Sequence, residues 1–442
     1  MPIDVATVRL WGSEIGAVAW NADRDVATFE YMPAFQESGI ELAPFMMPLG
    51  PAIHSFPNLA AETFYGLPGM LADALPDKFG NLLIDAWLQR SGRSSESFSP
   101  VERLCYMGRR SMGALEFEPA LRQRPDKSEA IDVAQLVKLA ADALAQKESL
   151  QSRFSGEAKG DVAAMQEILR VGTSAGGARA KAVIAWNEAT GEVRSGQVEA
   201  PSGFGYWLLK FDGVAGNRDK ELEDPRGYGL IEFAYYQMAV AAGIEMSPCR
   251  IFCENGRNHF MTKRFDRTDD GEKVFMQSLC ALGHFDFNQA GAHSYEQAIE
   301  IAERLGVGRA EREQLFRRSV FNILARNQDD HTKNIAFLMD KGGQWRLSPA
   351  FDVTYSYNPD GPWTSQHQMT LQGKRKEFTI ADFEATAARF RLFRGKRLRE
   401  LLYSVDEAIG NWKEFGAQAG LSTKAIDEIA ANHRRVDQMP KA

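Results

Sequence analysis

The segment from Ala325 to Asp340, ARNQDDHTKNIAFLMD, constrains most strongly what this chain can form. Polar and charged side chains gather between two apolar runs, and the second run, IAFLM, has the composition of a buried strand. Ordinary charged surface segments are rarely followed at once by such a strand. The pattern therefore predicts a polar loop that is fixed at both ends by buried elements, as catalytic loops are.

The spacing inside this segment indicates phosphoryl transfer. Asp329 and Asn334 are as far apart as the aspartate and asparagine of the protein-kinase loop H-R-D-x-x-x-x-N. In that loop the aspartate orients the attacking hydroxyl group, and the asparagine binds magnesium. Lys333 supplies a cation for the transferring group, and Asp352 in SPAFDVTYS supplies a second carboxylate for magnesium.

Upstream residues suit the binding of nucleotide phosphates. Gly176 and Gly177 precede a predicted strand, so backbone N–H groups could approach phosphate oxygens, although a hairpin turn explains these glycines equally well. Lys210 ends the run YWLLK, and Glu232 lies in the next predicted helix, as in the kinase lysine–glutamate pair. A lysine that reaches solvent from a strand end is the alternative for Lys210. The order of these features along the chain is more informative than any one of them.

The periodicity predicts a β-rich part followed by a helical part. Short strands are expected in 5–20, two helices in 60–89, and a helix in 128–146 capped by Ser128 or Asp132. Residues 147–161 read as a linker. Strands of an antiparallel sheet follow, and beyond Ser294 the pattern is helical except for a hairpin in 334–348. We predict an α+β, bilobed protein-kinase/lipid-kinase-like fold with domains 1–150 (a small sheet plus helices), 151–265 (the β-rich N-lobe) and 266–442 (the helical C-lobe).

Composition indicates the cellular compartment and the classes of partner that the chain can bind. No apolar run approaches the ~20 residues of a membrane span, and the first residues do not resemble a signal peptide. The four cysteines are scattered, so we expect a cytoplasmic protein with reduced thiols. The net charge of −7 argues against nucleic-acid binding by the overall field. The basic run RFRLFRGKRLRE, residues 389–400, is interpreted as a solvated helix face.

The sequence resembles the HipA-like serine/threonine kinases, the toxin kinases of bacterial toxin–antitoxin modules. The most specific stretch is NQDDHTKNIAFLMDKGGQWRLSPAFDV, and the likeness extends through TSAGGARAK, WLLKFD, FMTKRFDR and LQGKRKEFTIADF. It reaches the N-terminal part in LADALPD and YMGRRSMGALEFEP, and so covers nearly the whole chain. Related lipid kinases share an Asp-x-His-x-x-x-Asn arrangement, so the fold alone leaves the substrate open.

The resemblance implies a role for each matching residue. Asp329 becomes the catalytic base, Asn334 and Asp352 become magnesium ligands, and Ser174 matches a serine that the family phosphorylates on itself. For His331 the alternatives are contact with ATP and orientation of the loop from the core. The chain departs from some relatives at Asp330, where they have glycine. The implied ATP-binding residues are Gly176, Gly177, Ala178, Arg179, Ala180, Lys181, Lys210, Lys263, Arg264, Phe265, His331, Lys333, Asn334 and Asp352, of which Lys263 to Phe265 would hold the adenine.

The resemblance also implies an ATP- and Mg²⁺-dependent kinase that acts on a protein, with an aminoacyl-tRNA synthetase as one candidate target. The implied partner is a small helix-turn-helix antitoxin, and DNA is reached only through that partner. Two alternatives stay open at this point. One is a small-molecule or lipid kinase with the same phosphate machinery, and the other is a non-catalytic partner of a repressor.

Overall fold

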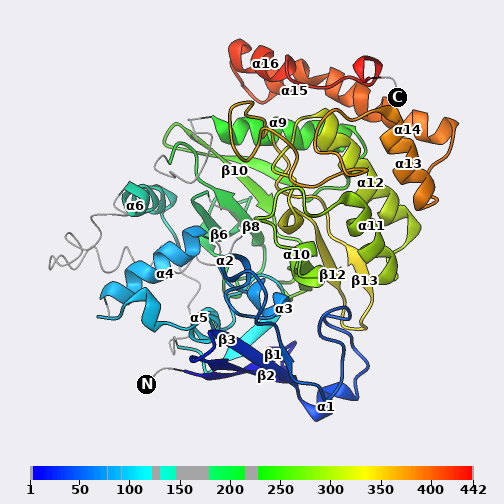
Figure 1. The fold of residues 1–442 in the computed structure, drawn as a ribbon. Coiled ribbons are helices and arrows are strands. Elements are labelled where there is room, and N and C mark those ends of the chain that lie inside the picture. The colour runs from blue at the N-terminus through cyan, green and yellow to red at the C-terminus, as the bar shows by residue number, and fades with distance from the viewer. Residues whose placement is uncertain are drawn as a thin grey trace. The chain divides into compact units, whose positions relative to one another are not determined.

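A computed structural model describes residues 3–76, 78–90, 92–121, 130–145, 179–214 and 227–440, and Figure 1 traces their helices and strands. The chain forms two compact units. The first contains Met1–Arg226, Phe252–Gln277 and Asp340–Gly343. The second contains Gly227–Ile251, Ser278–Met339 and Gln344–Ala442. The predicted linker at 147–161 lies outside the described residues.

The first unit begins with an antiparallel sheet of order β4-β3-β2-β1-β5. Its strands are β1 (Val5–Leu10), β2 (Ser13–Asn21), β3 (Val26–Tyr31), β4 (His54–Ser55) and β5 (Leu115–Glu118). Alternate residues of β1 are buried, as the predicted strand requires. At Gly16 a Cβ atom would stand 2.5 Å from the carbonyl oxygen of Glu30, so glycine permits the close pairing of β2 and β3.

The region 60–89 contains three helices, so the prediction of two helices is wrong. The helices are α2 (Ala61–Phe64), α3 (Gly69–Ala72) and α4 (Lys78–Arg90). The chain leaves α2 with Tyr65 at φ 54° and Gly66 at φ 72°, and Pro68 then precedes α3. Such left-handed residues end a helix even where the apolar spacing continues. Among the described residues of this unit, the other helices are α1 (Pro33–Gln36), η1 (Ser95–Ser97), α5 (Pro100–Met107) and α6 (Val133–Ala145).

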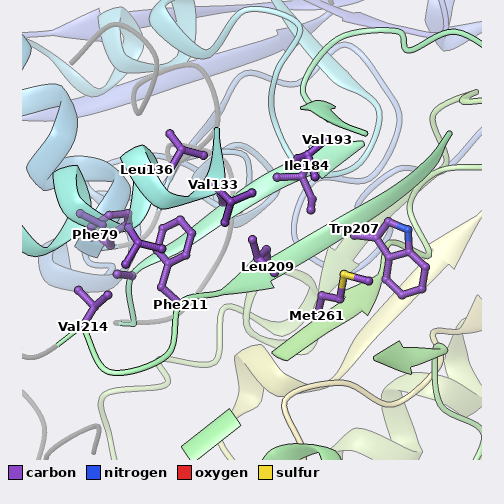
Figure 2. Close-up of a cluster of buried hydrophobic side chains, with 14 of the residues drawn as sticks. Phe79, Val133, Leu136, Ile184, Val193, Trp207, Leu209, Phe211, Val214 and Met261 are labelled. Carbon is purple, nitrogen blue, oxygen red and sulfur yellow. The ribbon is translucent and has the colours of Figure 1, made fainter. Parts of the chain in front are cut away.

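A second sheet has the order β7-β6-β8-β10-β9. Figure 2 shows its core, where Val133 and Leu136 of α6 lie with Ile184, Leu209 and other buried apolar side chains. The Asp132 carboxylate accepts a hydrogen bond from the Ala134 N–H at 2.9 Å, which confirms Asp132 as the helix cap. The strands are β6 (Lys181–Trp186), β7 (Val193–Ser195), β8 (Gly205–Lys210), β9 (Cys249–Glu254) and β10 (Arg257–Lys263), and β11 (Phe275–Ser278) follows them in the chain.

Beyond Ser294 the regular elements of the described residues are helices apart from one hairpin, in agreement with the periodicity. The hairpin pairs β12 (Ala336–Met339) with β13 (Trp345–Leu347). The mixed α+β fold class with two lobes is thereby confirmed, while the three domain boundaries stay a prediction. No helix among the described residues is long and apolar enough to cross a membrane. The helices described in the second unit are α9 (Tyr228–Ala241), α10 (Leu279–Gly283), α11 (Tyr295–Arg304), α12 (Arg309–Leu324), η2 (Thr332–Asn334), α13 (Ile380–Arg389), α14 (Lys396–Gly410), α15 (Trp412–Gln418), α16 (Thr423–Ala430) and η3 (Val436–Gln438).

Candidate active site

The polar loop predicted from the sequence connects α12 to β12 in the second unit. Helix α12 ends at Leu324, and Arg326 turns the chain with φ 59°. The last turn of α12 and all four residues of β12 are buried, so both ends of the loop are fixed by packing. This arrangement confirms the predicted loop between two buried elements.

Asp329 lies in this loop with its carboxylate accessible and its backbone fixed. Its side chain is 42% exposed. Its carbonyl oxygen accepts a hydrogen bond from Asn334 Nδ2 at 2.8 Å, and the Asn334 N–H donates to the His331 carbonyl at 2.9 Å. One oxygen of Asp329, Oδ1, accepts a hydrogen bond from the Trp363 indole N–H at 2.7 Å. The carboxylate is therefore held by one oxygen and could receive a substrate proton on the other.

Asn334 and Asp352 line the same cavity of the second unit, together with Asp330, His331 and Arg318. Because Asn334 Nδ2 donates to the Asp329 carbonyl, the acceptor atom that its side chain can offer to a ligand is Oδ1. Carboxylate and amide oxygens suit Mg²⁺, which also takes ligands from phosphates and water. The described residues contain no group of three or more His, Cys, Asp or Glu side chains that could hold a metal by themselves. A magnesium ion would thus be held by Asn334 and Asp352 with oxygens from a nucleotide and solvent.

His331 and Lys333 both lie against Phe287. The His331 ring centroid is 5.2 Å from that of Phe287, and Lys333 Nζ is 4.7 Å from the same ring centroid. His331 Nε2 is 3.9 Å from Asp329 Oδ1, which is too long for a hydrogen bond. His331 Nδ1 is buried and finds no hydrogen-bond partner among the described residues. The packing on Phe287 fits an orienting role and the free Nδ1 fits contact with a ligand, so both alternatives stay open.

Asp330, which the sequence marked only as a departure from relatives, is 3% exposed and anchors the loop. Its Oδ2 atom accepts hydrogen bonds from the Tyr295 hydroxyl at 2.6 Å and from His367 Nδ1 at 2.8 Å. Its Oδ1 atom accepts one from the Gln368 N–H at 2.7 Å. Burial would raise the pKa of Asp330, but the interactions with His367, Tyr295 and Gln368 outweigh it and hold the pKa below its usual value.

The hydrogen bonds of His367 fix its tautomer. Its Nε2 atom lies 3.0 Å from Arg434 NH1, and a guanidinium can only donate, so Nε2 accepts. Nδ1 therefore carries the proton that is donated to Asp330. Burial, more than the neighbouring Arg434, lowers the pKa of His367, and the nearby Asp330 only partly opposes this effect. A neutral imidazole thus connects an ionised carboxylate to a guanidinium.

The segment 363–368 forms hydrogen bonds with three successive residues of the polar loop, at positions 328, 329 and 330. Gln328 Nε2 donates to the Thr364 carbonyl at 2.9 Å, Trp363 binds the carboxylate of Asp329, and His367 and Gln368 bind that of Asp330. The sequence did not reveal this segment as part of the site. Its only signal was the run of polar and aromatic residues after Asp352, in a region without regular secondary structure.

The predicted phosphate-binding lysines belong to the first unit. Lys181 of β6 and Lys210 of β8 are 2% and 6% exposed, and they are direct partners in the register of the two strands. Side chains of directly paired residues lie on the same face of a sheet, so the two lysines share one face of this sheet. Arg179 is also buried, whereas Ser174, Gly176, Gly177 and Ala178 lie outside the described residues.

The charged side chains of the segment predicted to hold adenine pair with aspartates of the same unit, Arg264 in the interior and Lys263 at the surface. The Arg264 guanidinium donates to Asp266 at 2.8 and 2.7 Å, and Lys263 Nζ lies 2.6 Å from Asp269 Oδ1. If this segment holds a base, it does so through its backbone and the Phe265 side chain. Glu232 is 1% exposed in α9 of the second unit, and its pairing with Lys210 of the first unit stays a prediction.

Comparison with known proteins agrees with this architecture. The profile of the HipA-like C-terminal domain matches residues 173–435, and that of the HipA N-terminal domain matches residues 6–118. The HipA chain in the Shewanella oneidensis HipA, HipB and operator DNA complex has a TM-score of 0.65 at 16% identity, covering 96% of this chain and 94% of that chain. The fold is therefore that of HipA.

Two further similarities are more limited. A "Putative kinase Y4mE" from Sinorhizobium fredii is 26% identical over 160 residues, which are 34% of this chain and 36% of that relative. The Helicobacter pylori kinase CtkA has a TM-score of 0.33 at 12% identity over 53% of this chain and 88% of that chain, too little to bear on the fold. Since the C-terminal profile alone spans more than half of the sequence, the chain belongs to the HipA-like family.

Proposed function

We propose that this protein is an ATP- and Mg²⁺-dependent kinase that transfers the γ-phosphoryl group to a serine or threonine hydroxyl of a protein. The observation that carries the proposal is the geometry of the loop: an accessible Asp329 carboxylate on a backbone fixed by Asn334, with Asn334 and Asp352 lining one cavity. Family membership and the kinase-named relative support the reaction class.

Each residue of the proposed site has a separate role in phosphoryl transfer. Asp329 would accept the proton of the acceptor hydroxyl, and Lys333 would face the transferring group. Magnesium, when bound by Asn334 and Asp352, supplies positive charge that neutralises the phosphate oxygens. Lys181 and Lys210 would bind phosphates of the nucleotide. The arrangement needs no covalent enzyme intermediate, because positioning and charge stabilisation suffice for phosphoryl transfer.

The proposal is tested by incubating purified protein with γ-³²P-ATP and Mg²⁺, with and without candidate protein substrates. Asp329→Asn keeps the shape and the acceptor oxygen for Trp363 but removes the base, so transfer should fall by at least ~100-fold. Asp340→Asn is a matched control, because this carboxylate binds the Gly342 N–H in the β12–β13 turn. Near-normal transfer by Asp329→Asn would refute the assignment. Label on lipid or small-molecule acceptors alone would instead favour the alternative kinase class.

Self-phosphorylation of Ser174 is part of the same proposal. The residue lies just before the glycine-rich segment at Gly176 and Gly177, and a phosphoserine would add about −1.5 to −2 charges there at pH 7. That charge should repel the phosphates of ATP. Mass spectrometry after incubation with ATP should locate phosphate on Ser174, and the phosphorylated form should bind ATP weakly. Full ATP affinity of that form would refute the switch.

A helix-turn-helix antitoxin is the proposed partner, supported by the HipA neighbour, whose complex contains HipB and operator DNA. The basic residues of the segment 389–399 are exposed at the end of α13 and the start of α14, but the net charge of −7 opposes unaided DNA binding. In a gel-shift assay at physiological salt the protein alone should leave operator DNA free. Retardation by the protein alone would contradict this part of the proposal.

A further inference from the structure

Trp363 lies in a segment without regular secondary structure and donates the hydrogen bond from its indole N–H to Asp329 Oδ1 at 2.7 Å. Among the described residues it is the only donor recorded to this carboxylate, since His331 Nε2 stands 3.9 Å away. The backbone of Asp329 is already fixed by Asn334. The remaining freedom of Asp329 is rotation of its side chain, and Trp363 is placed to limit that rotation.

The backbone that carries Trp363 is itself tied to the catalytic loop. The Trp363 carbonyl accepts a hydrogen bond from Gln368 Nε2, which also donates to the Gln328 carbonyl at 3.2 Å. The neighbouring Thr364 carbonyl accepts one from Gln328 Nε2 at 2.9 Å. The indole therefore approaches Asp329 from a support that is bound to the residue just before Asp329. A side chain held in this way keeps its position relative to the carboxylate when the surface around it moves.

We propose that Trp363 is a positioning residue for the transfer reaction: by occupying Oδ1 of Asp329, it directs Oδ2 toward the acceptor hydroxyl. This inference rests on the proposed kinase function. A carboxylate free to rotate would offer either oxygen in many orientations, and a general base acts only within hydrogen-bond reach of the proton it accepts. Misplacement by about 1 Å is enough to cost ~100-fold in rate. Trp363 should thus affect turnover while leaving nucleotide binding unchanged, because it does not line the cavity that contains Asn334 and Asp352.

The test compares Trp363→Phe with the wild-type protein in the labelled-ATP assay. Phenylalanine keeps an aromatic ring but has no N–H group. We expect kcat to fall by about tenfold or more, within the range that misplaced catalytic groups show, while the KM for ATP changes less than twofold. Benzothienylalanine at position 363 replaces the indole N–H by sulfur with little change in shape, and it should reproduce the loss of kcat.

Trp412→Phe is the matched control. The Trp412 indole N–H donates to the Ile426 carbonyl at 3.0 Å in the same unit, without contact to Asp329. That variant should lose thermal stability without losing kcat per folded molecule, which separates positioning from general support of the fold. An unchanged kcat in both Trp363 variants, with activity that still depends on Asp329, would overturn the role of Trp363 alone. A wild-type protein without Asp329-dependent transfer would overturn the proposed function and this inference together.

Discussion

Asp266 in the first unit and Asp330 in the second are both buried and both accept several hydrogen bonds, but from donors of different charge. Asp266 is bound by the guanidinium groups of Arg264 and Arg267 and by the Gly113 N–H at 2.7 Å. Burial would raise the pKa of Asp266, but the two guanidinium charges hold it far below its usual value. The direct donors to Asp330 are a hydroxyl, a neutral imidazole and a backbone N–H.

The difference separates two uses of a buried carboxylate. The Asp266 cluster includes more positive than negative charge, and it joins the segment after β10 to the segment before β5 within the first unit. The positive charge also affects Lys273. Burial, and after it the nearby Arg267, lowers the pKa of Lys273 to about 8, although the Glu116 carboxylate at 2.8 Å opposes this effect. The Asp330 cluster has little excess charge and lies next to Asp329 in the loop. The first cluster mainly stabilises a fold, and the second mainly orients a loop.

The same substitution at both sites should therefore have unequal effects, and the larger should be at Asp266. In Asp266→Asn two buried guanidinium groups lose their counter-charge, a change that typically costs about 3–5 kcal/mol of unfolding free energy. Urea unfolding followed by circular dichroism measures the cost. Asp269→Asn is the control, because its ion pair with Lys263 is exposed and should contribute little. A small cost for Asp266→Asn would contradict a structural role for this cluster.

Asp330→Asn should cost less stability and more activity. An asparagine keeps one acceptor oxygen, so some neutral donors stay satisfied, and the loss should be about 1–3 kcal/mol of unfolding free energy. The loop that carries Asp329 would no longer be held in place. The rate of phosphoryl transfer should therefore fall by a larger factor than the folded fraction does. Urea unfolding and the labelled-ATP assay on the same samples give both quantities. A stability loss equal to that of Asp266→Asn, with normal kcat per folded molecule, would erase the distinction between the two clusters.

A third prediction uses pH and concerns the buried His433 of the second unit. Burial, with the nearby Arg326 and Arg435, lowers the pKa of His433 to about 3, while an unfolded chain has a value near 6.5. Below pH 6.5 the unfolded state therefore binds a proton that the folded state refuses, and stability falls. One such residue contributes about 1.4 kcal/mol per pH unit. The loss should extend from about pH 6.5 down to about pH 3. Asp330, whose pKa is lowered in the folded state, loses its stabilisation only below about pH 4, where the unfolded aspartate takes up a proton.

The measurement is urea unfolding of wild type and His433→Asn between pH 7 and 4.5. The Nε2 atom of His433 lies 2.9 Å from the Tyr235 hydroxyl, and an asparagine could keep a polar contact there without titrating. The variant should show a flatter dependence of unfolding free energy on pH. Parallel curves for the two proteins would show that His433 does not contribute to the acid sensitivity.

Particular residues show how far the sequence could predict this site. The Asp329–Asn334 interval and the apolar runs around it lie in one short segment, so pattern and spacing sufficed to find the loop. The donors to Asp330 come from positions 35, 37 and 38 residues away, and no periodicity connects them. Trp363 was missed for the same reason, at 34 residues from Asp329. In the helical region 60–89, the left-handed residues Tyr65 and Gly66 ended a helix that the apolar spacing alone would have continued.

The smallest expected effect concerns Arg434, which favours one tautomer of His367 together with Asp330. In Arg434→Met the Nε2 atom of His367 loses its donor, so only the Asp330 carboxylate still favours a proton on Nδ1. In some molecules the proton should then lie on Nε2. Nδ1 could not donate to Asp330 in those molecules, and that hydrogen bond would be lost. Stability should fall by about 0.5–1.5 kcal/mol, and transfer should fall less than in Asp330→Asn.

The ¹⁵N chemical shifts of the His367 ring report the tautomer directly, because protonated and bare nitrogens resonate far apart. Arg435→Met is the matched control: its guanidinium binds Asp406 at 2.9 and 2.7 Å, so this variant should lose stability while the His367 shifts stay unchanged. If the proton of His367 stayed on Nδ1 in every molecule of Arg434→Met, Asp330 alone would suffice to fix the tautomer. Arg434 would then not belong to the Asp330 cluster.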